Sequence, residues 1–287
     1  MADTTAGAVG AGPFERDTAV QLTHSDGSRR SFQATVAPGW RAGRGPHGGY
    51  LAAILLRALT ESVDDPTRAP RSLTIHYAKA PLAGPVQIHT TIEREGRSLS
   101  TLSARMEQDG ALVALVLSAF SVPWNGPEIS ELPLPEVSGP DPEREAGTAV
   151  KFGAPPFTEH LVMQPRFNGR PFDGGEHPME VAAWLGLAEA RPIDALALAF
   201  FSDALIPAPF MRTAAPSPAP TVDLSIHFRV SLPRVPDPDP QELCFVRIKA
   251  GVIHEGFFEE DGVIWASDGT VLAQSRQLAI LMPPPVE

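Results

Sequence analysis

Cysteine is almost absent from this chain of 287 residues, in which Cys244 is the only one. A single cysteine excludes an internal disulfide and a cysteine-rich metal cage, and it suits a reducing cytoplasm. No neighbouring residue would lower the pKa of its thiol. We therefore interpret Cys244, in the segment ELCFVRI, as a small buried strand residue and not as a nucleophile.

Positive charge and long apolar runs are also scarce. The chain holds 23 Lys and Arg against 34 Asp and Glu, a formal net charge of −11, which argues against nucleic acid or an anionic membrane as a partner. Its longest uncharged apolar run, ALVALVLSAFSVPW, is shorter than the ~20 residues that span a bilayer. The N-terminal residues lack the basic and apolar regions of a signal peptide. We expect a soluble, cytoplasmic protein.

Several catalytic motifs are missing. The sequence has no G-x-S-x-G elbow, no Walker or dinucleotide-binding glycine motif, and no spacing of His, Asp and Glu that indicates a metal site. These absences disfavour a serine hydrolase, a nucleotide-dependent enzyme and a metalloenzyme. We expect neither a metal nor an organic cofactor.

One pattern occurs twice in the chain. Apolar and polar side chains alternate in RSLTIHYAKAPL, residues 71–82, and VDLSIHFRVSLP, residues 222–233, repeats the alternation in the same phase. Each strand follows an apolar helical stretch, HGGYLAAILLRALTESV and RPIDALALAFFSDAL, and precedes strand-like segments joined at QDG or SDG turns. The repeat predicts an α+β chain of two halves, 14–124 and 157–287, joined by a Pro-rich acidic linker, 125–156.

A carboxylate interrupts one of the most apolar of these stretches. IDALALAFFSDALIPAP, residues 193–209, carries Asp203 near its end, and a helix there would place Leu196, Phe200 and Asp203 on one face. An ionised carboxylate among apolar groups is costly unless it is paired or hydrogen-bonded. Asp203 is therefore either a capping residue at a helix end before Pro207 or a functional carboxylate of an active site.

The chain resembles the two-domain acyl-CoA thioesterases of the thioesterase II (TesB-like) type. GRGPHGGYLAAILLRALTESV and RSLTIHYAKAPLAGPVQI carry the first part of the resemblance, and FFSDALIPAP, TVDLSIHFR and VLAQSRQLAILM carry the second. The resemblance covers nearly the whole chain and implies a double hotdog fold, two tandem repeats that each wrap an antiparallel sheet round a central helix. It also implies that Asp203, Thr221 and Gln277 hold and activate the water that attacks a thioester.

The residues themselves support these roles unequally. Thioester hydrolysis needs an acceptor that orients water and donors that stabilise an oxyanion, and Asp203 can supply the acceptor. Gln277 shares its strand face with apolar residues, so it is an inward amide with either a functional or a structural role. Strict alternation places Thr221 opposite the apolar row, as a strand-start hydroxyl, unless a twist or bulge turns it inward.

Only the second half contains the full set of Asp203, Thr221 and Gln277. Alignment of IHY with IHF places Pro70 where Thr221 stands, and alignment of the Asp-Gly turns places Ser118 where Gln277 stands. The first helix, residues 50–60, holds no carboxylate. This asymmetry is expected if one active site per chain survived a duplication, and it is unexplained if the polar residues serve the fold alone.

The PHGGYL turn is the remaining candidate. Gly48 and Gly49 at a helix start leave backbone N–H groups that could polarise a thioester carbonyl or bind a phosphate, although they could equally form a tight turn. We predict that His47, Gly48 and Gly49 contribute to substrate binding. His47, His76 and His227 are alternatively ordinary surface or interface histidines.

The predicted activity is hydrolysis of an acyl-CoA to a free acid and CoA. Two alternatives stay open, a non-catalytic acyl-CoA binding protein and a hotdog-fold enoyl-CoA hydratase. The second is weaker, because such hydratases usually carry an Asp and a His after Asn-Pro, and neither Asn125 nor Asn168 precedes proline. Exposed strand edges favour association, so we expect a homodimer or a larger homo-oligomer.

Overall fold

The computed structural model describes residues 12–141 and 154–283, and most of its regular structure is β-strand. The α-helices are α1 (Pro13–Asp17), α2 (Gly48–Val63) and α3 (Ala195–Phe201), and the short 3-10 helices are η1 (Pro38–Trp40), η2 (Pro156–His160) and η3 (Ala208–Met211). The strands before the linker are β1 (Val20–Asp26), β2 (Arg29–Val36), β3 (Arg41–Ala42), β4 (Gly45–Pro46), β5 (Ala69–Tyr77), β6 (Gly84–Glu95), β7 (Leu99–Gln108) and β8 (Ala111–Ser121). Those after it are β9 (Leu161–Pro165), β10 (Glu180–Leu187), β11 (Thr221–Phe228), β12 (Cys244–Lys249), β13 (Ile253–His254), β14 (Phe257–Trp265) and β15 (Val271–Ile280).

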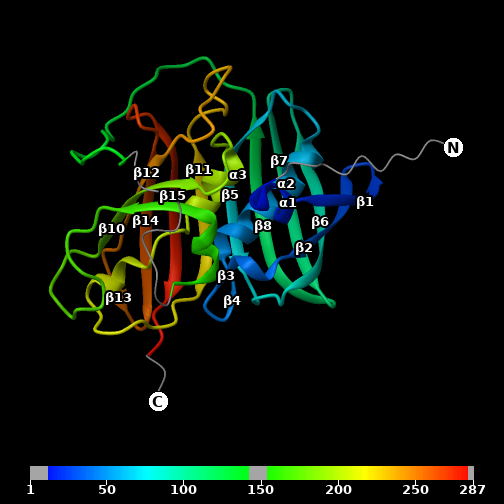
Figure 1. Ribbon diagram of the computed structural model, residues 1–287. Helices are drawn as coiled ribbons and strands as arrows, with labels where there is room; N and C mark the ends of the chain where they lie inside the picture. The colour runs from blue at the N-terminus through cyan, green and yellow to red at the C-terminus, as the bar shows by residue number, and fades with distance from the viewer. Residues whose placement is uncertain (1–11, 142–153, 284–287) are drawn as a thin grey trace.

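A single large sheet joins the two halves. Its order is β1-β2-β6-β7-β8-β5-β11-β15-β14-β12-β10-β9, with β13 paired to β14, and β3 and β4 form a separate small ribbon. The two strands of the repeated pattern, β5 and β11, lie side by side in the middle of this sheet (Figure 1) and pair antiparallel from Ser72 opposite His227 to His76 opposite Asp223. The strands of one half therefore continue into the strands of the other.

The alternation predicted for β5 and β11 is confirmed. Ile75 and Ile226 are fully buried, whereas His76 and His227, on the opposite phase, are exposed. The QDG and SDG turns join β7 to β8 and β14 to β15, as their Asp-Gly dipeptides predicted. His76 and His227 are thus surface histidines of the described structure.

A register shift occurs at corresponding positions of the two central strands. The pairing of β5 with β8 shifts between Pro70 and Ser72, and the pairing of β11 with β15 shifts between Thr221 and Asp223. A bulge of this kind places one extra residue on the bulged strand and changes which side chains face inward. The site described below uses the bulge of the second half.

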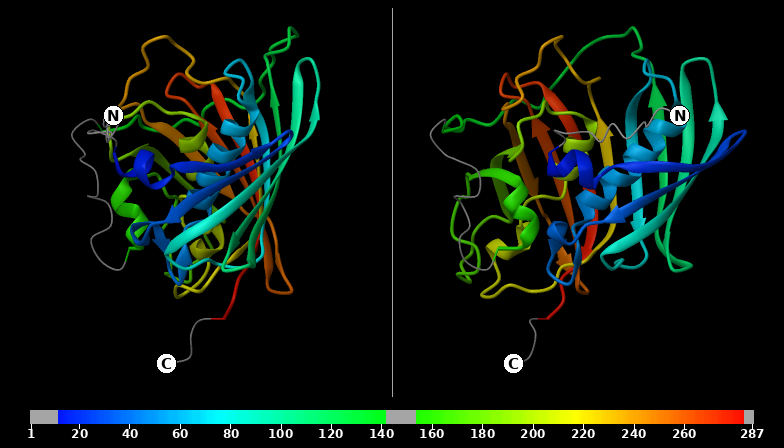
Figure 2. Two further views of the ribbon diagram at one scale, coloured as in Figure 1. Left: turned by 90° about the vertical axis from the view of Figure 1, so that its right-hand side faces the viewer. Right: turned by 45° about the vertical axis from the view of Figure 1, so that its right-hand side comes forward.

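The helices lie on one face of the sheet (Figure 2). α2 forms where it was predicted, and every residue from Gly49 to Leu56 is buried, because the helix packs against β2, β6 and β7 on one side and α3 on another. A helix that is apolar all round is typical of a protein core. In the described part of the chain, no helix is long and apolar enough to cross a membrane.

The second predicted helix is shorter than its apolar stretch. Asp194 caps the N-terminus of α3, where its Oδ1 accepts the N–H of Ala197 at 2.8 Å. The helix ends at Phe201, before the prolines Pro207 and Pro209, which cannot donate to a continuing helix. Asp203 therefore lies in the turn after α3 and not on a helical face.

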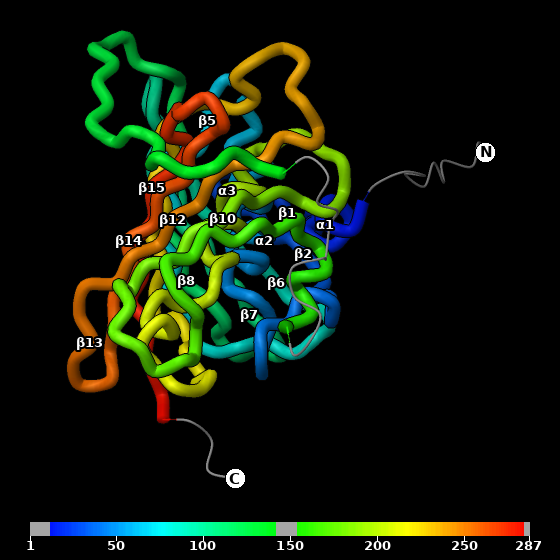
Figure 3. The backbone as a smooth tube through the Cα atoms, turned by 60° about the vertical axis from the view of Figure 1, so that its left-hand side comes forward, coloured from blue at the N-terminus to red at the C-terminus, as the bar shows by residue number. Residues whose placement is uncertain are grey.

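The structure describes two parts of the predicted linker, 125–156: residues 125–141 and 154–156. Residues 142–153 lie outside the described part of the chain. The preceding residues run over the outer side of the second half (Figure 3), where Leu134 packs against a cluster that contains Trp184 and Trp265. The linker thus adds apolar contacts to the second half. The predicted domain boundaries stay predictions.

The interpretation of Cys244 is confirmed. The residue lies in β12 and is fully buried, with its thiol directed at the carbonyl oxygen of Leu185 at 3.6 Å. Burial raises the pKa of this thiol, so the thiolate that a nucleophile requires is disfavoured. Cys244 is a core residue.

Candidate active site

Asp203 lies against the N-terminus of α2. Its Oδ2 accepts the N–H of Gly49 at 2.9 Å, and its backbone carbonyl oxygen accepts from His47 Nε2 at 2.8 Å. The N-terminus of a helix favours a negative charge, because its first N–H groups have no acceptor within the helix and its peptide dipoles are aligned. The fold thus brings together two segments, PHGGYL and FFSDAL, that were predicted separately.

The two glycines of this turn are required by close packing. A Cβ added to Gly48 would lie 2.8 Å from Asp203 Oδ2, and a Cβ added to Gly49 would lie 2.5 Å from the carbonyl oxygen of Phe200. Tyr77 approaches from β5, and its hydroxyl donates to the carbonyl oxygen of Gly48 at 2.9 Å. Burial and the charge of Asp203 raise the pKa of Tyr77, so its hydroxyl keeps the proton that it donates.

We expect Gly48→Ala to lower the free energy of unfolding by about 1–3 kcal/mol, the usual cost of overpacking. The added methyl group would contact Asp203 Oδ2, and the buried turn around it leaves little room for a shift. Urea denaturation of the variant and the wild type measures the difference. Gly126→Ala is the matched control, because a Cβ at Gly126 meets no atom within 4 Å. Equal stability losses in the two variants would contradict this account.

His47 is buried and uses both ring nitrogens within the protein. Its Nδ1 accepts the N–H of Tyr50 at 3.2 Å, which caps α2, and its Nε2 donates to Asp203. Burial lowers the pKa of His47, although the charge of Asp203 opposes the shift, so the imidazole is neutral. Through these two hydrogen bonds the ring holds the turn of Asp203 against α2. The predicted contact of His47 with a substrate stays a prediction.

The N–H groups of the two glycines differ in their partners. Gly49 N–H is bound to Asp203, as described above. Gly48 N–H has no acceptor among the hydrogen bonds of residues 12–141 and 154–283. Of the two groups predicted to polarise a carbonyl, Gly48 N–H is therefore the one that is available.

A β-bulge turns Thr221 toward Gln277. The register of β11 against β15 shifts between Thr221 and Asp223, and Thr221 Oγ1 donates to Gln277 Oε1 at 3.4 Å. The bulge breaks the strict alternation that placed Thr221 on the polar row. Gln277 itself is 8% exposed, which confirms that its amide points inward.

Glu260 joins this pair, although no motif marks it in the sequence. It lies in β14 directly opposite Gln277, with only 3% of its surface exposed. Gln277 Nε2 donates to Glu260 Oε2, and the N–H of Ala208 donates to Glu260 Oε1 at 2.5 Å. The signal that could have identified Glu260 is the alternation of β14, which places it on the same buried face as Phe258 and Ile264.

Burial raises the pKa of Glu260 to about 7, although the hydrogen bonds from Ala208 and Gln277 oppose the shift. The charges of Asp203 and Glu259 add to the increase. The charge of Asp203 thus acts on Glu260, which in turn binds Gln277. The cluster combines one partly exposed carboxylate with a hydroxyl, an amide and a second, buried carboxyl.

Metal ligands do not gather in this cluster or elsewhere in the described part of the chain, where no group of three or more His, Cys, Asp or Glu side chains is placed to hold an ion. Asp203 is the most accessible carboxylate of the cluster, with 15% of its side chain exposed. Its Oδ1 has no hydrogen-bond partner among the described residues, so one lone-pair side of the carboxylate can accept from a water molecule.

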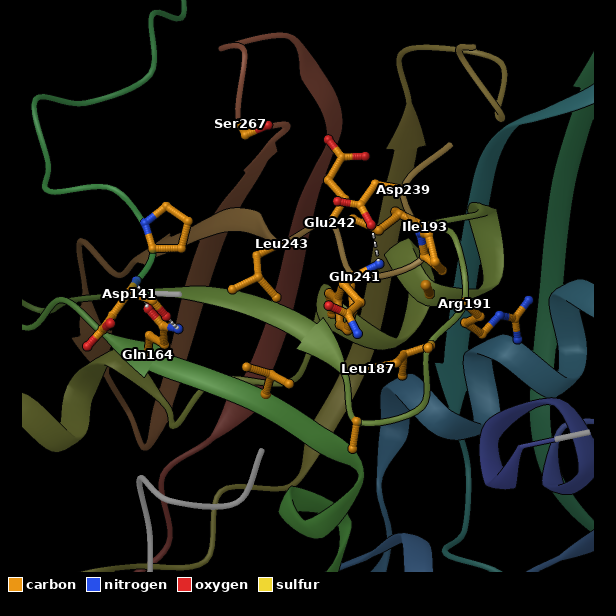
Figure 4. A pocket seen from close by; sticks show the side chains of 17 residues that line it. Asp141, Gln164, Leu187, Arg191, Ile193, Asp239, Gln241, Glu242, Leu243 and Ser267 are labelled. Atoms are coloured by element: carbon orange, nitrogen blue, oxygen red, sulfur yellow. Dashed lines mark hydrogen bonds between the residues drawn. The ribbon is translucent and has the colours of Figure 1, made fainter. Parts of the chain in front are cut away.

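A cavity of about 620 Å³ lies beside the start of α3 (Figure 4). Leu187, Ile193 and Leu243 give it apolar walls, and Arg191 and Phe201 also line it. Its lining includes none of the cluster residues described above. Ala197 and Phe201 of α3 line the cavity, and Asp203 lies in the turn that follows α3.

Two family models match this chain. Residues 36–121 match the N-terminal domain of acyl-CoA thioesterases, and residues 133–281 match the C-terminal domain. The chain belongs to the acyl-CoA thioesterase family. The two matches occur in the family's order, and the C-terminal match contains Asp203, Thr221, Glu260 and Gln277.

Known proteins and solved structures similar to this chain cover most of its length. An uncharacterised protein of Mycobacterium tuberculosis is 25% identical over 285 residues, which cover 88% of this chain and 91% of the relative. A hot dog fold protein of unknown function from Alicyclobacillus acidocaldarius superposes with a TM-score of 0.81 at 24% identity, and covers 96% of this chain and 100% of its own. An acyl-CoA thioesterase II from Mycobacterium marinum gives 0.72 at 16% identity, over 96% and 98%. The fold is of the hotdog type, and the predicted resemblance to the thioesterase II (TesB-like) family is confirmed.

Proposed function

We propose that this member of the acyl-CoA thioesterase family hydrolyses an acyl-CoA thioester, with Asp203 as the acceptor for the attacking water. The observation that carries the proposal is the two-sided environment of the carboxylate. Oδ2 is held by Gly49 N–H, whereas Oδ1 has no partner among the described residues and the side chain stays partly exposed. A carboxylate oriented in this way can take a proton from water.

The reaction then needs few groups. The water oxygen forms a bond to the thioester carbonyl carbon while its proton passes to Asp203 Oδ1, and the carbonyl oxygen becomes an oxyanion. Gly48 N–H, at the start of the 16-residue helix α2, can donate to that oxyanion. When the C–S bond breaks, the proton on Asp203 passes to the CoA sulfur, which leaves as the thiol and returns the carboxylate.

Thr221 and Gln277 complete the proposed site. The Thr221 hydroxyl, from β11, donates to the Gln277 amide oxygen, from β15, and both oxygens keep a lone pair that can accept from water. A water molecule needs several such partners to be held in a reactive orientation. We therefore assign the two residues to positioning of the attacking water.

We propose that the two halves are two hotdog repeats and that only the second is catalytic. Ser118 pairs with Leu73 across β5 and β8, as Gln277 pairs with Leu224 across β11 and β15. The first repeat thus has a serine at the position of the amide, and Pro70 at the bulge where the second repeat has its threonine. This comparison supports one site per chain, in a double hotdog arrangement.

Purified protein is expected to release free CoA thiol from at least one member of a panel of acyl-CoAs that runs from short to long chains. Free thiol is measured with a thiol reagent, with and without a chelator. Saturable binding without thiol release would support the non-catalytic alternative, and loss of activity on chelation would contradict the predicted absence of a metal. The predicted homo-oligomer stays a prediction.

A further inference from the structure

Glu260 is a buried carboxyl group at a position where the first half of the chain has a leucine. In the first half, Ser118 pairs with Leu102 across β7 and β8, as Gln277 pairs with Glu260 across β14 and β15. Leu102 is fully buried at that position. Because a buried carboxyl group costs free energy that a leucine does not, its presence in the half with the proposed site calls for a reason.

The contacts of Glu260 determine which way the Gln277 amide points. Glu260 Oε1 is occupied by Ala208 N–H, so Oε2 is the oxygen that faces Gln277. A carboxylate oxygen only accepts hydrogen bonds, and of the two ends of an amide only the nitrogen donates. The nitrogen of Gln277 must therefore turn toward Glu260, and its oxygen then faces Thr221, as observed.

We propose that Glu260 is a positioning residue that fixes the orientation of the Gln277 amide, so that the amide oxygen faces Thr221 and the attacking water. This proposal rests on the proposed function, because Gln277, the residue that Glu260 would orient, belongs to the proposed active site. Glu260 acts through Gln277 and needs no contact with the substrate.

The same geometry makes the orientation sensitive to pH. The charged groups that act on Glu260 are Asp203, from the turn after α3, and Glu259, from its own strand, and both disfavour its ionisation. The pKa of Glu260 is raised to about 7, so the carboxylate predominates only above that pH. Below it, the protonated carboxyl can donate to Gln277 Oε1 and allow the reversed amide. We therefore expect kcat to rise with pH through about 7.

Glu260→Gln tests this assignment. Ala208 N–H still needs an acceptor, so the new side chain keeps its oxygen there and turns its nitrogen toward Gln277, which must reverse. We expect kcat to fall by about 10- to 100-fold with little change in KM, as for a misplaced reactive group. The rise of kcat through about pH 7 should also disappear. Wild-type kcat with an unchanged pH profile would overturn the proposal.

A second readout does not depend on activity. In nuclear Overhauser spectra of labelled protein at pH 8, the side-chain amide protons of Gln277 should lie near Ala208 in the wild type and near the Thr221 methyl group in Glu260→Gln. An unchanged pattern would overturn the proposal even if no acyl-CoA were hydrolysed. An inactive wild type with a reversed amide in the variant would instead contradict only the proposed function.

Two further variants separate orientation from stability. The double variant Glu260→Gln, Gln277→Glu restores an acceptor opposite Thr221. Its kcat should therefore be about tenfold higher than that of Glu260→Gln alone. Glu260→Leu copies Leu102 of the first half. It leaves Ala208 N–H without its acceptor and should therefore lose some stability, and it should also lose kcat because no carboxylate orients the Gln277 amide. Failure of the double variant to recover activity, or a fully active leucine variant, would show that Glu260 does not position Gln277.

Discussion

Asp203→Asn is expected to lower kcat by about 10²–10⁴-fold, which corresponds to about 3–5 kcal/mol of activation free energy. An asparagine has nearly the same shape, and its carbonyl oxygen can still accept Gly49 N–H, so its nitrogen takes the place of Oδ1. The water then meets a donor where the wild type offers an acceptor. Folding and substrate binding should change little, because no other contact of the side chain is lost.

Asp194→Asn is the matched control for this prediction. Asp194 caps the other end of α3, where it accepts from Ala197 N–H and pairs with Arg191. Its replacement should leave kcat unchanged and cost at most about 1 kcal/mol of stability. Steady-state thiol release and melting temperature are measured for both variants and the wild type. If Asp203→Asn retained the wild-type kcat, Asp203 would be only a partner of the α2 N-terminus.

Phe200→Ala is expected to cost about 3–5 kcal/mol of unfolding free energy, the range for a large aromatic residue in a core. Phe200 is fully buried where the two halves of the chain pack against each other. Its ring lies 5.3–5.7 Å, centroid to centroid, from the rings of Phe14 and Trp40 in the first half, and contacts reach His47 and Phe157 as well. Alanine would leave a cavity between all of these rings.

Phe257→Ala, the same change at a residue that is 43% exposed, serves as the control. It should cost much less, because most of the lost surface already contacts solvent. Urea denaturation measures both variants. A stability loss for Phe200→Ala no larger than that for Phe257→Ala would mean that the packing between the halves contributes little to the fold.

The regular elements could be predicted because their residues repeat with a clear period. The alternation around Ile75 and Ile226 identified the central strands, and the apolar stretch that begins at Gly48 identified α2 with nearly its observed bounds. In these segments, local preference and burial favour the same structure. The two Asp-Gly turns were informative for the same reason, since such turns need positive φ angles, which Asp109, Gly110 and Gly269 adopt.

The candidate site was less predictable, because it depends on departures from those periods. Asp203 lies just past the end of a helix that periodicity alone would extend, and Thr221 faces Gln277 only through a bulge. Glu260 follows the period, but a buried carboxyl group looks like an exposed one until its neighbours are known. The bond from His47 to Asp203 joins residues 156 positions apart, a contact that no local pattern encodes.

The pairing of β5 with β11 has a consequence for the newly made chain. Thr74 and Ser225, which meet across this pair, are 151 positions apart. At the usual 5–20 residues per second of synthesis, β5 emerges from the ribosome roughly 8 to 30 seconds before its partner. During that interval β5 can already pair with β8, while its other edge presents open N–H and C=O groups. On a crowded polysome, the second half of the same chain must reach this edge before a strand of a neighbouring nascent chain does.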